Sequence, residues 1–353
     1  MEHVVRDILK ATAKNPKESA FMAKFALRAK SSASVRTDRS FLPPFLIASV
    51  TNLCNMHCKG CYVQGIGSCH SAAEAAEDSA VPESELLSAG EWRSVFKQAR
   101  DAGICFIIIV GGEPLLRPDV LDVAAEFPEI LFPIFSNGTL MTEQYLSLFN
   151  QHRNLVPILS LEGDQEETDG RRGEGIYETL QACMARMEAR GLLFGVSITV
   201  TTDNIRSVTD DAFIQEMRKQ GCRAVFFVDY VSTSEADRML EPADEHRDYI
   251  KERMEFIRRD YPDMIFISFP GDEKASGGCL AAGRGFFHIN AYGGAEPCPF
   301  SPYSDLNVRE TPLTDVMESK LFRALHESDM LLEDHPGGCV LASHDAEVRA
   351  LMK

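Results

Sequence analysis

Residues 44–62 read PFLIASVTNLCNMHCKGCY, and the rest of the chain is best interpreted from this stretch outward. The apolar run FLIASV is typical of a buried strand. It leads directly into a loop that carries Cys54, Cys58 and Cys61, in the spacing C-x3-C-x2-C. Three cysteines this close together can place three thiolates around one small volume. The loop is therefore predicted to bind a metal centre.

Two kinds of centre are compatible with such a loop. A closed zinc site needs a fourth ligand nearby, and zinc loops usually show paired C-x2-C knuckles or a histidine at fixed spacing. Three thiolates alone suit three irons of a cubane cluster, with the fourth iron left open. His57 lies inside the loop and is interpreted as a spacer. Three unlinked thiols are the remaining alternative from this loop alone.

The composition is that of an ordinary globular protein. The chain has 353 residues, of which 44% are hydrophobic and 25% charged, enough for one large and one small domain. A net charge of −17 disfavours nucleic acid and anionic membranes as partners. The opening MEHVVRDILKATAK has no apolar core, so a signal peptide is not expected, and no run suggests a membrane span. Ten cysteines then predict metal or redox chemistry in the cytoplasm rather than disulfides.

From residue 45 an apolar run followed by an amphipathic stretch occurs six times. The runs are nearly continuous, as expected for parallel strands that are buried on both faces. The strands are expected at 45–50, 105–110, 130–135, 156–161, 193–200 and 224–231, and the helices at 84–102, 118–126, 142–151, 174–190, 208–220 and 244–260. Six such units predict an α/β fold, either barrel-like or an open parallel sheet. Its active site is expected at the carboxyl ends of the strands.

The two ends of the chain follow other patterns. Residues 1–30 show helical periodicity, which Pro16 divides into two short helices, and 31–43 is interpreted as a polar connector. After residue 262 the strands become short and are punctuated by glycines. The elements expected there are strands at 264–269 and 285–290, a hairpin turn at 292–294 and a helix at 313–327. The predicted domains are a helical extension over 1–43, a core over 44–262 and a small α+β domain over 263–353.

Polar residues follow the predicted strands at the edge where an active site is expected. Gly111 and Gly112 allow close approach of a ligand, although a tight turn is the simpler explanation. Glu113 is placed to accept hydrogen bonds from an ammonium group. Arg171 or Arg172 can pair with a carboxylate through two hydrogen bonds. Together with the cysteine loop, these residues describe a pocket for an amino acid that chelates the cluster.

The motifs taken together resemble those of the radical S-adenosylmethionine (radical SAM) enzymes. The cysteine loop, GGEP, SNGT and SLEG…D…RR fall in order at successive strand ends, over roughly residues 45–230. The resemblance implies a partial (β/α)6 TIM-like barrel in which Cys54, Cys58 and Cys61 hold a [4Fe–4S] cluster. Reductive cleavage of S-adenosylmethionine then yields methionine and a 5′-deoxyadenosyl radical, which takes hydrogen from a substrate.

The resemblance also implies contacts to S-adenosylmethionine. The residues concerned are Gly111, Gly112 and Glu113 for the amino group, Ser160 with Arg172 or Arg171 for the ribose and carboxylate, and Tyr62 and Asn137 as further cofactor contacts. One position departs from the family pattern. The residue before the third cysteine is often aromatic, and here it is Gly60. A backbone contact to adenine is compatible with that change, whereas a stacking contact from residue 60 is not.

The C-terminal part resembles the auxiliary-cluster extensions called SPASM and, in a shorter form, twitch. Cys279 and Cys298 reproduce the spacing C-x13-G-x4-C, and Cys339 is the third ligand that the resemblance implies. Where the twitch pattern has a fourth cysteine this chain has Ala342. One auxiliary iron–sulfur cluster, expected to be [4Fe–4S], is therefore implied with three thiolates. Its fourth iron is either open to substrate or bound by another residue, for which His344 is the candidate; three structural thiols are the alternative.

The function implied is that of a radical SAM oxidoreductase or rearrangement enzyme acting on a small molecule. A peptide-modifying maturase is the close alternative. A non-catalytic iron–sulfur electron-transfer protein is the alternative from another class. Asp229 and Tyr230, at the end of the sixth strand, are the candidate catalytic residues. A flavodoxin- or ferredoxin-type protein is the expected electron donor.

Overall fold

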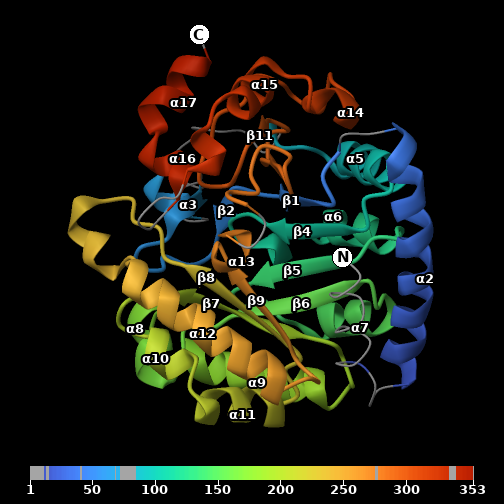
Figure 1. The fold of residues 1–353 in the computed structure, drawn as a ribbon. Coiled ribbons are helices and arrows are strands. Elements are labelled where there is room, and N and C mark those ends of the chain that lie inside the picture. The colour runs from blue at the N-terminus through green and yellow to red at the C-terminus, as the bar shows by residue number, and fades with distance from the viewer. Residues whose placement is uncertain are drawn as a thin grey trace.

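The structure is a computed structural model that describes residues 12, 16–39, 42–67, 69–71, 85–274, 277–333 and 339–352. Within these residues the chain forms a curled nine-stranded sheet with helices on its outer face (Figure 1). Across the sheet, the strands lie in the order β11 (Ala295–Glu296), β10 (His288–Ile289), β1 (Phe45–Ser49), β4 (Phe106–Val110), β5 (Phe132–Ser136), β6 (Leu155–Ser160), β7 (Gly195–Val200), β8 (Ala224–Asp229) and β9 (Ile265–Phe269).

The central part of this sheet confirms the predicted fold. Strands β1 and β4 to β8 correspond to the six predicted apolar runs, and each pairs in parallel with the next along the chain. The result is a half-barrel of the partial (β/α)6 type. The outer helices are α5 (Ala89–Asp101), α6 (Pro118–Ala125), α7 (Glu143–Gln151), α8 (Gln165–Arg172), α9 (Ile176–Glu188), α10 (Ile205–Val208), α11 (Asp211–Lys219) and α12 (Asp244–Asp260).

Local signals explain where several helices begin. Ser88 caps α5 and forms a reciprocal capping box with Glu91, so this helix begins later than the sequence pattern predicts. Thr142 caps α7, as expected. Helix α8 was missed, because its sequence QEETDGRR has no apolar periodicity to detect. The helix expected at 208–220 corresponds to α11, which begins after its cap Asp210, and the short α10 ends at Val208 before it.

The N-terminal helix closes the base of the half-barrel. Helix α2 (Pro16–Arg39) runs along the amino ends of the strands (Figure 1). Its Met22 and Phe25 are buried in a cluster with lumen residues such as Cys105 and Leu131. The prediction of a polar connector over 31–43 was wrong, since the helix continues to Arg39. Once a helix has formed, each further residue adds one backbone hydrogen bond, and polar residues can extend it in this way.

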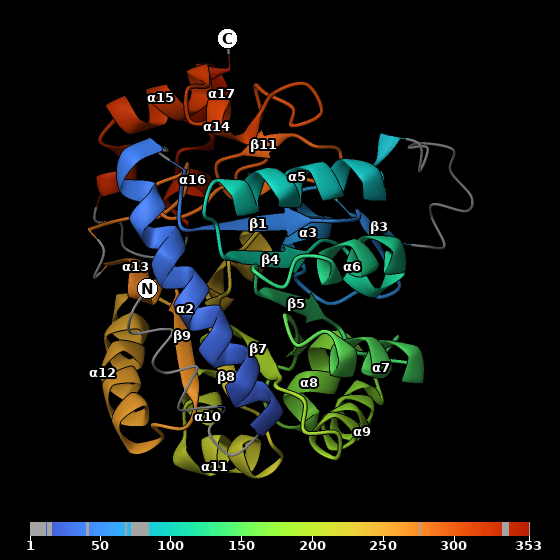
Figure 2. The same ribbon diagram turned by 90° about the vertical axis from the view of Figure 1, so that its right-hand side faces the viewer.

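The segment after residue 262 contributes to both edges of the sheet (Figure 2). Strand β9 pairs in parallel with β8, and β10 pairs in parallel with β1. Strands β10 and β11 form the expected antiparallel hairpin. The helix predicted at 313–327 is two helices, α14 (Leu313–Val316) and α15 (Lys320–Glu327), because Ser319 caps the second. The remaining elements are α3 (Tyr62–Gly65), α13 (Gly271–Lys274), α16 (Val340–Ser343), α17 (Asp345–Leu351) and a small sheet of β2 (Leu53–Cys54) and β3 (His70–Ser71).

Among the described helices, none combines the length and the hydropathy that crossing a bilayer requires.

Candidate functional site

The cysteine loop is held against the end of β4 by backbone contacts. The amide of Gly112 donates to the Thr51 carbonyl (2.9 Å), and the amide of Glu113 donates to the Leu53 carbonyl (2.7 Å). A Cβ atom on Gly112 would lie 2.0 Å from the Leu53 oxygen, and one on Gly111 would lie 2.4 Å from the Thr51 oxygen. The two glycines are therefore needed for the loop to reach its position, whatever ligand they also contact.

The Glu113 carboxylate is buried and organises the ends of two strands. It accepts hydrogen bonds from the Ser136 hydroxyl (2.8 Å) and from the backbone amides of Asn137 (2.8 Å) and Leu115 (3.0 Å). Burial raises the pKa of this carboxyl, and these donors act in the opposite direction. If Glu113 contacts an ammonium group as expected, it does so with a carboxylate that three donors of this protein already hold in place.

Asn137 connects the same edge to the cysteine loop. Its side-chain nitrogen donates to the Asn55 side chain (2.9 Å) and lies 4.0 Å from the Cys54 sulfur. Its side-chain oxygen accepts from the Thr139 amide (3.0 Å). The residue predicted as a cofactor contact thus also orients the first cysteine of the loop.

Glu162 is a residue whose role the sequence analysis did not identify. Its buried carboxylate pairs with Arg171 (2.6 Å) and with the Nε of Arg172 (2.7 Å), and it accepts from the Thr199 amide (3.1 Å). Arg171 also donates to the Lys59 carbonyl (3.1 Å). Both arginines thus have a carboxylate partner within the chain. The sequence did point to Glu162, since it belongs to the SLEG motif. Its pairing with residues nine and ten positions later could not be predicted, because that pairing depends on helix α8.

The three loop thiols lie in a setting that fits an anionic cluster. Burial raises the pKa of Cys54 to about 11, and the neighbouring Glu113, Cys58 and Cys61 add to the rise. Burial also raises the pKa of Cys58, while the guanidinium of Arg172, 3.9 Å from its sulfur, lowers it. Such thiols are protonated on their own and need a bound metal to become thiolates. Arg172 supplies a positive charge that offsets the charge of three thiolates.

A single metal ion is a poorer match. Among the described residues, no group of three or more His, Cys, Asp or Glu side chains is arranged to hold one ion. Cluster cysteines bind different iron atoms, so they do not have to converge on one point.

Tyr230 packs against the cysteine loop. Its ring is buried, its hydroxyl has no hydrogen-bond partner among the described residues, and the Arg171 guanidinium lies 6.0 Å from its centroid. A Cβ atom on Gly60 would lie 2.3 Å from the Tyr230 hydroxyl oxygen. The predicted catalytic tyrosine therefore occupies space that a side chain at residue 60 would need.

The other predicted site residues lie in more varied surroundings. Asp229 lies on the same face of β8 as Phe227, which packs with α12, and it pairs with Arg247 of that helix (3.3 Å). Burial raises its pKa to about 6, and Arg247 acts against the rise. Ser160 is half-buried at the end of β6. Tyr62 begins α3, and its ring centroid lies 4.5 Å from that of Phe300.

The three C-terminal cysteines gather with one carboxylate. The Cys298 and Cys339 thiols are hydrogen-bond partners. The Cys279 thiol donates to the side chain of Glu273, which also accepts from the Leu280 amide (3.3 Å). Glu273 is only 6% exposed, and burial, with Cys339 nearby, raises its pKa to about 7. The sequence analysis missed Glu273, because only the fold brings α13 to the cysteines.

His344 is engaged elsewhere. Its Nε2 pairs with Glu333 (2.9 Å), and its Nδ1 lies 3.7 Å from Glu347. The hydrogen bond that its ring makes to the Glu333 carboxylate raises the pKa of His344. Its assignment as a cluster ligand remains a prediction, and Glu273 is the better-placed oxygen or nitrogen donor.

Comparison with known proteins agrees with this geometry. Residues 48–219 match the family model of the Radical SAM superfamily. The chain is 25% identical over 316 residues to an AdoMet-dependent heme synthase of Methanosarcina barkeri, covering 82% of this chain and 86% of that protein. It is also 25% identical to a PqqA peptide cyclase of Rhizobium meliloti, covering 86% and 82% of the two chains.

Solved structures share the fold. The Streptococcus suis protein SuiB superposes with a TM-score of 0.67 at 16% identity, covering 92% of this chain and 77% of SuiB. The protein anSMEcpe, solved with bound AdoMet, superposes with a TM-score of 0.61 at 14% identity, covering 86% and 95%.

Proposed function

We propose that the radical SAM domain formed by residues 48–219 makes this chain an enzyme that takes a hydrogen atom from a substrate. When bound at Cys54, Cys58 and Cys61, a [4Fe–4S] cluster supplies the electron that cleaves S-adenosylmethionine into methionine and a 5′-deoxyadenosyl radical. The observation that carries the proposal is the meeting of the cysteine loop with GGEP, SNGT and the Arg171–Arg172 pair at one edge of the half-barrel.

The side chains around the loop have distinct roles in this proposal. Arg172 lies beside Cys58 and neutralises part of the thiolate charge. Arg171 bridges Glu162 to the loop carbonyl of Lys59 and so fixes the loop relative to β6. Gly111, Ser160 and Tyr62 offer contacts to S-adenosylmethionine at the same strand ends. An electron-transfer protein that does not cleave S-adenosylmethionine has no need for these contacts, which favours the enzyme.

A second cluster is proposed at the three C-terminal cysteines. Cys279, Cys298 and Cys339 would be its thiolate ligands, and the contacts between Cys298 and Cys339 and between Cys279 and Glu273 support this set. We assign the fourth protein ligand to Glu273 rather than His344. A carboxylate is an anionic oxygen donor, and that of Glu273 already contacts the Cys279 thiol. Cluster chemistry is consistent with a reducing cytoplasm, where a flavodoxin- or ferredoxin-type donor would reduce the first cluster.

The substrate is proposed to be a small molecule. The similarity to AdoMet-dependent heme synthase over most of both chains supports this class. A peptide substrate is the second candidate, favoured by the similarity to PqqA peptide cyclase and by the shared fold of SuiB, which has also been solved bound to its precursor peptide SuiA.

The decisive experiment is anaerobic. Reconstituted full-length protein, incubated with dithionite and S-adenosylmethionine, should form 5′-deoxyadenosine. The Cys58→Ala variant should form none, while Cys222→Ala, which removes a buried thiol near the amino end of β8, should behave as the wild type. Absence of 5′-deoxyadenosine from protein that contains its full complement of iron would contradict the enzyme proposal and leave the electron-transfer alternative.

A further inference from the structure

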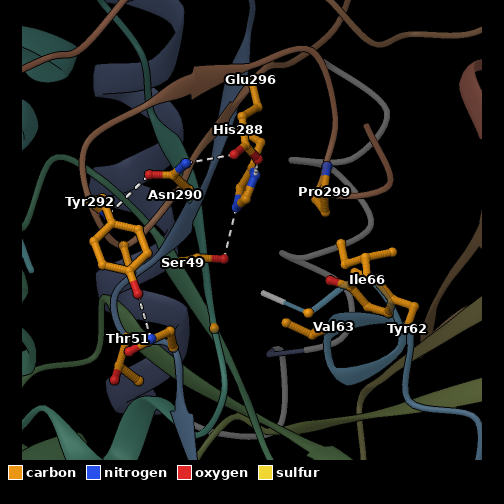
Figure 3. Close-up of a pocket in the computed structure, with 14 residues that line it drawn as sticks. Ser49, Thr51, Tyr62, Val63, Ile66, His288, Asn290, Tyr292, Glu296 and Pro299 are labelled. Atoms are coloured by element: carbon orange, nitrogen blue, oxygen red, sulfur yellow. Dashed lines mark hydrogen bonds and ion pairs between the residues drawn. The ribbon is translucent and has the colours of Figure 1, made fainter. Parts of the chain in front are cut away.

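A cavity of about 180 Å³ lies between the end of β1, helix α3 and the β10–β11 hairpin. Ser49, His288 and Asn290 line one side of it (Figure 3). None of the roles proposed above uses these three residues. The cavity adjoins the cysteine loop through Tyr62 and the GGEP motif through Gly111, so a molecule bound in it would lie next to the site of radical chemistry.

The polar side of the cavity is a continuous chain of hydrogen bonds. The Ser49 oxygen lies 2.8 Å from Nε2 of His288, and Nδ1 of His288 lies 2.7 Å from the Glu296 carboxylate. The other oxygen of Glu296 accepts from the Asn290 amide (2.6 Å). Both His288 and Glu296 are 5% exposed. The hairpin register places His288 opposite Glu296 and the parallel register places it beside Ile47, so the backbone itself sets this geometry.

The direction of this chain follows from its end at Glu296. An ionised carboxylate only accepts hydrogen bonds, so Nδ1 of His288 carries the proton that is donated to it. We assign the neutral ring to His288, in which Nε2 accepts a hydrogen bond from the Ser49 hydroxyl. Ser49 is left with its oxygen lone pairs free to accept. Along the path Ser49–His288–Glu296 each donor is directed to the next residue, and the Ser49 oxygen becomes an acceptor for whatever enters.

The opposite side of the cavity has different chemistry. Val63, Ile66 and Pro299 present apolar groups there, with Tyr62 beside them (Figure 3). Among the described lining residues none is Lys or Arg, so an anionic group would find no counter-charge. A ligand that fits both sides has an apolar or aromatic body and one O–H or N–H donor.

We propose that this cavity binds the substrate, and that Ser49 accepts a hydrogen bond from an O–H or N–H group carried on an apolar or aromatic body. His288 and Glu296 act as positioning residues, because they hold the Ser49 hydroxyl turned away from the cavity. The bonds also tie the hairpin to β1. A purely structural role does not explain why this series of hydrogen bonds ends at a cavity beside the cysteine loop. The inference depends on the proposed function in one respect only, which is that the molecule bound in the cavity is the substrate of the enzyme.

The test uses the full, cluster-loaded chain in its oxidised state and phenol as the probe, with anisole as the matched probe that lacks a donor. Saturation-transfer NMR titrations measure both dissociation constants. Phenol is expected to bind, with anisole weaker by about fivefold, the effect of one neutral hydrogen bond. Ser49→Ala should remove the difference between the probes. Ser197→Ala, a half-buried strand serine outside the cavity, should preserve it.

Three outcomes of the phenol and anisole titrations would overturn the inference. They are no binding of phenol to the wild type, equal affinity for phenol and anisole, and an unchanged preference for phenol in Ser49→Ala. Displacement of phenol by S-adenosylmethionine would also overturn it, because the cavity would then belong to the cofactor. None of these measurements depends on cleavage of S-adenosylmethionine, so failure here is separate from failure of the proposed function. His288→Phe, which removes the acceptor of the Ser49 hydroxyl, should weaken phenol binding about as much as Ser49→Ala.

Discussion

The side chain of Tyr230 packs directly against Gly60 of the cysteine loop, although the two residues are 170 positions apart in the chain. Gly60 adopts a positive φ of 61°, and a Cβ atom there would lie 2.3 Å from the Tyr230 hydroxyl oxygen. The aromatic side chain that the family resemblance led us to expect before the third cysteine has no room here. An aromatic ring from the end of β8 lies in its place.

This relationship predicts that Gly60→Ala destabilises the protein. The left-handed backbone and the contact with Tyr230 together should cost about 1–3 kcal/mol. Thermal melting of the anaerobic protein measures the effect as a lower midpoint. Tyr230→Phe keeps the ring and removes only a hydroxyl without a hydrogen-bond partner among the described residues, so it should melt like the wild type. Equal melting of Gly60→Ala and wild type would show that the tyrosine moves away freely.

A second prediction concerns the Glu162 carboxylate. Glu162→Gln leaves Arg171 and Arg172 without their buried partner, and a loss of about 3–5 kcal/mol is expected for such a change. Iron bound per chain should fall as well, since Arg171 holds the loop at Lys59.

The chain offers a matched control for this variant. Glu143 also pairs with two arginines, Arg186 and Arg190, but its side chain is 67% exposed. Glu143→Gln should therefore cost less than about 1 kcal/mol. Similar losses from both glutamates would argue against a special role for the buried group.

A third prediction separates the two candidate ligands of the auxiliary cluster. Glu273→Ala should change the electron paramagnetic resonance spectrum and the reduction potential of that cluster, because an oxygen ligand is lost from one iron. His344→Ala should leave both unchanged, since His344 pairs with Glu333 instead. The Cys54, Cys58 and Cys61 cluster should be unaffected in either variant. A spectrum altered by His344→Ala alone would restore the histidine as the ligand.

A fourth prediction concerns pH. Asp229 has its pKa raised from 3.8 to about 6 by burial. The folded state therefore binds this proton more tightly than the unfolded state. The contribution of Asp229 to stability is greatest below about pH 4 and falls as the pH rises towards 6, by roughly 2–3 kcal/mol in total.

Melting curves from pH 4.5 to 7.5 test this assignment. Asp229→Asn removes the titrating group, so the difference in melting temperature between wild type and variant should change across this range and become constant above about pH 7. A difference that does not vary with pH would show that Asp229 does not titrate there.

Short sequence patterns were sufficient to predict much of the fold and the edge of the sheet that carries the candidate site. Continuous apolar runs such as FLIASV and CFIIIV identified the parallel strands, because a strand that is covered on both faces needs no polar residues. The cysteine spacing and the residues at the strand ends identified the edge at which they meet, since carboxyl ends of parallel strands share one edge. These features depend on residues that are close together in the sequence, so a single sequence is enough to reveal them.

The tertiary structure decided which side chains meet across that edge. Glu162 finds its arginines only once α8 has formed, and Glu273 reaches the cysteines only because β9 joins the core sheet. His288 meets Ser49 because β10 adds to β1. Such contacts join residues up to 239 positions apart, and their cause is the pairing of strands in space. A single sequence carries no local pattern that reports this pairing.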